Sequence, residues 1–107
     1  MEVETMQLRG KKCFIDSKGR ITVEEPFFTA TISQLKALLL ISQGRGGKAV
    51  ADELNKTHGS IATLMNNLRR DNNYSTTTKL IGTATKLDLL NSIAIDGIRT
   101  KKAELIK

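Results

Sequence analysis

Small and polar side chains recur at helical spacing between residues 59 and 70 of this sequence. When Ile61 is placed inward, the 3.6-residue period brings five residues to the opposite face, namely Gly59, Thr63, Asn66, Asn67 and Arg70. Ser60 and Ala62 lie on the flanks of this face. An Asn amide can pair with both polar atoms of an adenine edge, an Arg guanidinium can pair in the same way with guanine, and a Thr can contact a thymine methyl group. These residue types predict a surface that reads base edges in the major groove of DNA.

The other reactive side chains indicate neither catalysis nor metal binding. One Cys, Cys13, and one His, His58, are too few for a four-ligand structural zinc site, and a single Cys forms no intrachain disulfide. Cys13 has no His close in sequence to activate it, and the chain shows no paired carboxylates or catalytic triad. The Gly-rich residues 45–48 lack the spacing of a phosphate-binding loop. We therefore expect a protein that is not an enzyme and that needs no metal and no cofactor.

The composition sets the class of protein. The chain has 107 residues, of which 39% are hydrophobic and 26% charged, which is typical of one soluble globular domain. The longest apolar run covers residues 37–41, far short of the roughly 18 residues that span a membrane, and the acidic N-terminus lacks the pattern of a signal peptide. We expect a cytoplasmic protein without a membrane partner. The net charge of +6 permits a nucleic-acid partner, although it is also common on an ordinary solvated surface.

Two short helical segments are predicted to position the polar face. Residues 48–54 form a helix of about two turns, in which the small Ala51 allows a second helix to cross closely. Asn55 tolerates the left-handed backbone of a tight turn, and Thr57 can cap the next helix, which extends to about residue 71. That helix carries one apolar stripe at i, i+3, i+4 and i+7, made of Ile61, Leu64, Met65 and Leu68. The pattern is that of a helix-turn-helix.

The segments on either side complete a mainly α fold that is α+β overall. Residues 1–30 are predicted to form an N-terminal β-hairpin or arm, with strands at 13–16 and 21–24 around Gly19 and with Pro26 ending the strand region. Thr31 caps a helix that Gly44 closes, so that residues 31–90 hold the helix-turn-helix domain.

A fourth helix, capped by Ser75 or Thr76 and ending near residue 90, completes that domain. Its inward residues are Leu80, Ile81, Ala84 and Leu87. Residues 91–107 are predicted to be a basic C-terminal tail or a short helix.

Residues 31–44 (TISQLKALLLISQG) and 48–54 (KAVADEL) resemble the LuxR/FixJ (GerE-type) DNA-binding domain, and the similarity continues through Thr57, Ile61 and Leu68 to residues 80–81 and 87–90. In that family the third of four helices enters the major groove and the fourth supports dimerisation. The resemblance implies phosphate contacts by Lys48 and Thr57, groove contacts by Thr63 and Asn66, and a dimer contact through Leu80, Ala84 and Leu87. The chain departs from the family at Gln34, Ala62, Leu64 and Asp71-Asn72, where the family has an acid, a basic residue, a His and a Lys-Leu pair.

These observations lead to one functional hypothesis and one competing hypothesis. The first is a sequence-specific regulator of transcription that binds double-stranded DNA as a homodimer. Its phosphate contacts are Lys48, Lys56, Thr57 and Arg69, and Thr63, Asn66, Asn67 and Arg70 lie at base edges with Ser60 beside them. The second is a protein-interaction module or co-regulator, a degenerate helix-turn-helix that docks on another transcription factor or on RNA polymerase, as Ala62 and Asp71 allow. A weaker likeness links residues 15–23 to the turn of AbrB-type swapped-hairpin DNA-binding proteins, with a plain covering hairpin as the alternative.

Overall fold

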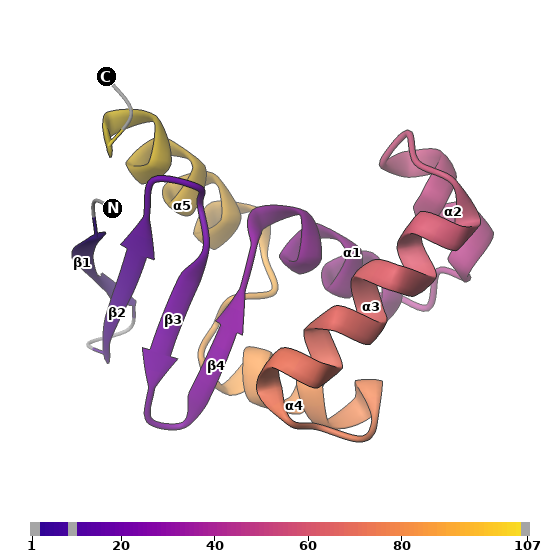
Figure 1. The fold of residues 1–107 in the computed structure, drawn as a ribbon, viewed down its shortest axis with the longest axis horizontal. Coiled ribbons are helices and arrows are strands. Elements are labelled where there is room, and N and C mark those ends of the chain that lie inside the picture. Colours follow the sequence, from indigo (N-terminus) through magenta and orange to yellow (C-terminus); the bar gives the residue numbers. More distant parts are fainter. Residues whose placement is uncertain (1–2, 9–10, 106–107) are drawn as a thin grey trace.

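The computed structural model describes residues 3–8 and 11–105 of the chain. Within them a four-stranded antiparallel sheet comes first and five helices follow, so the fold is α+β (Figure 1). The strands are β1 (Val3–Leu8), β2 (Lys11–Asp16), β3 (Ile21–Glu24) and β4 (Phe27–Ala30). The helices are α1 (Ile32–Ser42), α2 (Gly47–Glu53), α3 (His58–Asn72), α4 (Thr77–Lys86) and α5 (Ser92–Leu105).

The predicted hairpin forms, and it is the centre of a larger sheet. Strands β2 and β3 pair antiparallel, and the turn between them contains Gly19 at a φ of +84°, a conformation that glycine adopts without strain. The expectation that Pro26 ends the strand region is wrong. Pro26 lies in the turn between β3 and β4, and the chain continues into β4, where Phe28 pairs with Val23. Strand β1 adds to the other side of β2, which gives the order β1-β2-β3-β4.

The sheet and the helices share one hydrophobic core. Alternate side chains of the strands point to one face, and Ile15, Ile21 and Phe28 on that face have no exposed surface. Leu38 of α1 and Leu68 of α3 belong to the same buried cluster. The sheet therefore packs directly on the helices.

The helices of the helix-turn-helix segment have nearly the expected bounds. The turn between α2 and α3 contains Asn55 at a φ of 56°, the left-handed conformation that the sequence predicts. The side-chain oxygen of Thr57 accepts the N–H of Ser60 and caps α3, which is also as predicted. Helix α1 begins after Thr31 with a capping box, in which Thr31 and Gln34 each satisfy the other's backbone N–H.

The C-terminal third differs in detail from the expectation. Helix α4 begins after Thr76 and ends at Lys86 rather than near residue 90, and Asp88 after it has a φ of 57°. Of the two alternatives for the tail, residues 92–105 form a helix, α5, which lies behind the sheet in Figure 1 and buries Ile95 and Ile98. Among the residues that the structure describes, no helix is long and apolar enough to cross a membrane.

Candidate nucleic-acid interface

Helix α3 separates a buried stripe from an exposed polar face. The buried residues are Ile61, Met65, Leu68 and Asn72. The exposed ones include Gly59, Ser60, Thr63, Asn66 and Arg70, and Asn67 is half-buried beside them. The helical spacing read from the sequence therefore places the predicted base-reading residues on the solvent side of a helix whose opposite side is fixed in the core.

Three of the predicted phosphate contacts lie around the start of α3. Lys48 of α2 is exposed, as are Lys56 and Thr57 in the turn. The Thr57 hydroxyl oxygen caps α3 by accepting the Ser60 N–H at 3.0 Å. The same hydroxyl donates to the Ser60 hydroxyl oxygen at 2.8 Å. Both ammonium groups are therefore within reach of solvent or of a phosphate, as are the carboxylates of Asp52 and Glu53 between them in the sequence.

Arg69 has a role that the sequence did not predict. Its guanidinium is half-buried, donates from Nη1 to the Thr77 hydroxyl at 2.9 Å, and donates from Nη2 to Asn66 Oδ1. An arginine has no acceptor, so the oxygen of the Asn66 amide must face it and the amide nitrogen must point elsewhere. Arg69 therefore links α3 to the first turn of α4 and orients Asn66, one of the predicted base-reading residues.

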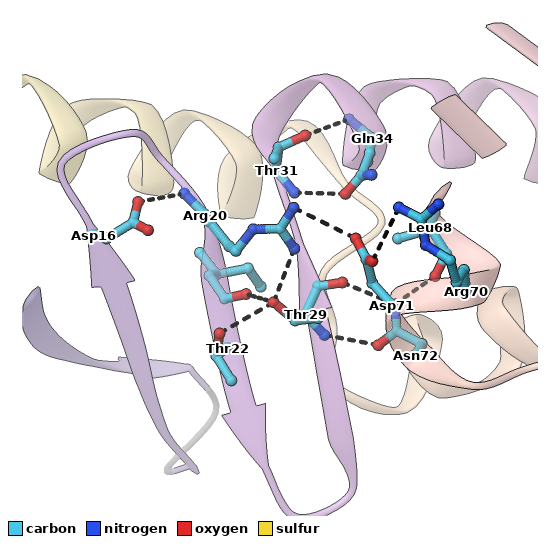
Figure 2. Close-up of polar contacts among 11 residues, drawn as sticks. Asp16, Arg20, Thr22, Thr29, Thr31, Gln34, Leu68, Arg70, Asp71 and Asn72 are labelled. Carbon is cyan, nitrogen blue, oxygen red and sulfur yellow. Dashed lines mark hydrogen bonds and ion pairs between the residues drawn. The ribbon is translucent and has the colours of Figure 1, made fainter. Parts of the chain in front are cut away.

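Asp71, the acid at the end of α3, pairs with two arginines. One carboxylate oxygen lies 3.6 Å from Arg20 Nη2 and the other 3.7 Å from Arg70 Nη2. Arg20 comes from the turn before β3 and also donates to the Thr29 hydroxyl at 3.2 Å (Figure 2). Sequence reasoning missed Arg20 because no local pattern connects the hairpin turn to the end of α3.

Asn72 joins the end of α3 to the sheet. Its Oδ1 accepts the Thr29 N–H at 2.8 Å, and its Nδ2 donates to the Thr29 carbonyl at 2.9 Å and to the Leu68 carbonyl at 2.8 Å (Figure 2). Strand β4 is an edge of the sheet, so the Asn72 amide satisfies the groups that a further strand would otherwise pair. This contact, which the sequence also did not predict, fixes where α3 ends relative to the sheet.

The three residues that the family resemblance assigns to a dimer contact are buried in this fold. Leu80, Ala84 and Leu87 are 0%, 0% and 2% exposed and belong to the chain's own core. Side chains that are buried within one chain have no area to offer to a second copy. The assignment of these three residues to dimerisation is therefore corrected to a role in the core.

The other reactive side chains of the described residues include one buried cysteine, Cys13. Residues 3–8 and 11–105 contain no group of three or more His, Cys, Asp or Glu side chains that could hold a metal ion. Burial raises the pKa of the Cys13 thiol, which disfavours the reactive thiolate. Comparison with known proteins adds no assignment, since no family model, no curated protein and no solved structure matches this chain.

Proposed function

We propose that this protein binds double-stranded DNA and reads its sequence with α3 in the major groove. The observation that carries the proposal is the exposed face of α3, where Thr63, Asn66 and Arg70 stand on a helix whose other side is locked in the core. Rigid presentation of amide, hydroxyl and guanidinium groups is what discrimination between base edges requires.

The charge around this face supports the proposal. Asp71 is the one acid in the sequence of α3, and its carboxylate is paired with Arg20 and Arg70 rather than left to repel a phosphate. Lys48 and Lys56 are exposed near the start of the same helix. Phosphate contacts by these lysines would set the position of α3, and contacts by its polar face would set the sequence.

The finer assignment is a LuxR-type helix-turn-helix over residues 31–90. It is supported by the order of four helices, the Asn55 turn and the Thr57 cap, together with the sequence resemblance. A homodimer on an inverted repeat is the arrangement that the resemblance implies. Because Leu80, Ala84 and Leu87 are buried, two copies on DNA would have to meet through other side chains.

The test is selection from a random duplex library at about 150 mM salt, where non-specific phosphate binding is suppressed. We expect enrichment of one motif by the wild-type protein. Asn66→Ala and Arg70→Ala should each relax the preference at one or two positions of that motif. The matched control is Arg99→Ala, which removes an exposed arginine of α5 and should leave the motif unchanged.

The enriched pool also separates the alternatives. An inverted repeat would indicate two copies, and a single half-site would indicate one. A pool without any motif, with retention that disappears as salt rises, would reject sequence-specific DNA binding. In that case a protein partner, such as another transcription factor or RNA polymerase, becomes the leading hypothesis.

A further inference from the structure

The charge of Arg69 sets this residue apart from the other arginines that the structure describes. Four of them form ion pairs with an Asp or Glu at 3.1–3.7 Å, and these are Arg20, Arg45, Arg70 and Arg99. The hydrogen-bond partners of Arg69 are instead the Thr77 hydroxyl and the Asn66 amide, which are both neutral. Within residues 3–8 and 11–105 no carboxylate pairs with its guanidinium, so the positive charge is available to a partner from outside the chain.

The surroundings of Arg69 favour a partner with electronegative atoms. The side chain is half-buried, and a partly desolvated charge without a counter-ion is unfavourable. Arg69 lines a pocket of about 320 Å³ on one flank of α3, together with His58, Asn66 and Thr77. Of the described residues around this pocket, none is an Asp or a Glu. A ligand atom with a partial negative charge, such as an acceptor on a base, meets no carboxylate there.

Helix α4 holds the guanidinium in place. Nη1 donates to the Thr77 hydroxyl at 2.9 Å, in the first turn of α4, while Nη2 donates to Asn66 Oδ1 in α3. These two bonds use two of the five N–H groups of a guanidinium, so others remain to donate to a ligand. Arg69 is therefore a fixed donor beside Asn66.

The same contact determines which atoms Asn66 offers. Because Oδ1 faces Nη2 of Arg69, the amide presents Nδ2 as its accessible group, and Nδ2 is a donor. An Asn that reads adenine needs both atoms, since Nδ2 donates to N7 while Oδ1 accepts the N6 amino group. That amino group would approach Oδ1 next to a guanidinium, and the positive hydrogens of the two groups repel each other. The contact therefore disfavours adenine, and it disfavours the N4 amino group of cytosine for the same reason.

We propose that Arg69 and Asn66 together select guanine in the major groove of DNA. The inference rests on the proposed function. Guanine presents two neighbouring acceptors there, O6 and N7, and the pair presents two neighbouring donors, Asn66 Nδ2 and an N–H of Arg69. Thymine offers one acceptor, O4, beside a methyl group. Arg69 is thus assigned to base selection rather than to the phosphate contact expected from the sequence, and guanine replaces adenine as the expected partner of Asn66.

The test is the random-duplex selection with Arg69→Met, which keeps an unbranched side chain but removes the charge and the donors. The motif position that Asn66 reads is identified as the one that Asn66→Ala relaxes. We expect guanine there for the wild-type protein and a shift toward adenine for Arg69→Met, because Oδ1 is then free to accept. Fluorescence anisotropy on the selected duplex and on its guanine-to-adenine counterpart should show the affinity ratio of guanine to adenine falling about tenfold.

The matched control is Arg99→Met in α5. Arg99 also donates to a side chain three residues before it, Asp96, at 3.1 Å, but it belongs to the helix behind the sheet (Figure 1). We expect Arg99→Met to select the wild-type motif.

A second arm uses the wild-type protein alone. Replacing the selected guanine by 7-deazaguanine removes the N7 acceptor and should weaken binding about fivefold. This arm decides the question even if Arg69→Met loses its fold, which circular dichroism detects. An unchanged affinity would show that this guanine edge is not read, and would overturn the inference.

The outcomes separate the inference from the proposed function. If the selected motif has adenine at that position, if Asn66→Ala relaxes no position, or if Arg69→Met keeps the guanine preference, the inference is refuted and the proposed function holds. If Arg69→Met weakens all duplexes equally and flattens the dependence of affinity on salt, Arg69 contacts a phosphate and the inference is likewise refuted. If the wild-type protein enriches no motif, the proposed function is refuted and the inference falls with it.

Discussion

Replacing Asn72 should destabilise the fold more than any other exchange of an Asn in α3. Asn72 is 5% exposed, and its amide satisfies the N–H and the carbonyl of Thr29. Asn72→Ala leaves both groups buried without a partner, at a cost of about 1–3 kcal/mol each. The Leu68 carbonyl still has the helical N–H of residue 72, and the better helix propensity of Ala returns about 0.5 kcal/mol. We expect a net loss of about 2–4 kcal/mol in the free energy of unfolding.

Urea unfolding followed by far-ultraviolet circular dichroism measures this loss, and Asn67→Ala in the same helix controls for helix propensity. A thermal scan should show a midpoint about 10 °C lower for Asn72→Ala. A difference below about 0.5 kcal/mol between the two variants would show that water replaces the amide and would refute the reasoning.

Asn72→Asp tests the same contact by charge. It keeps the acceptor for the Thr29 N–H but turns an oxygen toward the carbonyls of Thr29 and Leu68. Burial and these carbonyls should raise the native-state pKa of the new carboxyl above its unfolded value of about 3.9. The native state then binds the proton more tightly, so the stability should be highest below about pH 4 and should fall as pH rises through the raised pKa. A deficit that is independent of pH would contradict this account.

Three further predictions concern the sheet and the core. Arg20→Gln should weaken duplex binding about two- to fivefold, because the Asp71 carboxylate near the DNA then keeps only Arg70 as a partner, and adding Asp71→Asn should restore the affinity. Anisotropy titrations of the two single variants and the double variant measure these affinities. Additive effects of the two changes on the affinity would contradict the pairing of Arg20 with Asp71. Leu80→Ala should lower the free energy of unfolding in urea by about 2–5 kcal/mol, because Leu80 is fully buried. The mass of the folded protein in sedimentation should stay the same. A variant that dissociates from a dimer without losing stability would contradict the assignment of Leu80 to the core. The Cys13 thiol should react with Ellman's reagent much more slowly in the folded protein than in urea, and equal rates would show that it is accessible.

The parts of the fold that depend on short-range patterns could be predicted. The φ of Asn55, the Thr57 cap and most of the buried stripe of α3 follow from residues within one or two turns of each other. Leu64, predicted in the same stripe, is only half-buried. The hairpin around Gly19 is of the same kind. The predicted end of the strand region at Pro26 failed because proline suits the turn between two strands as well as the end of a sheet.

The candidate site was predicted in part. Periodicity placed Thr63, Asn66 and Arg70 on an exposed face, because a helix face follows from spacing alone. It gave no sign that Arg69 orients Asn66, because this depends on which helices come together.

The sequence by itself determined the helices within residues 31–72, the caps Thr31 and Thr57, and the chemical types on the face of α3, since each is set by neighbours along the chain. The tertiary structure alone decided that Asn72 completes the edge of β4, that Arg20 pairs with Asp71, and that Leu80 lies inside one chain rather than between two. The physical reason is that buried polar groups and charges are satisfied by whatever partner the packing brings within reach, and an apolar stripe does not specify which surface will cover it.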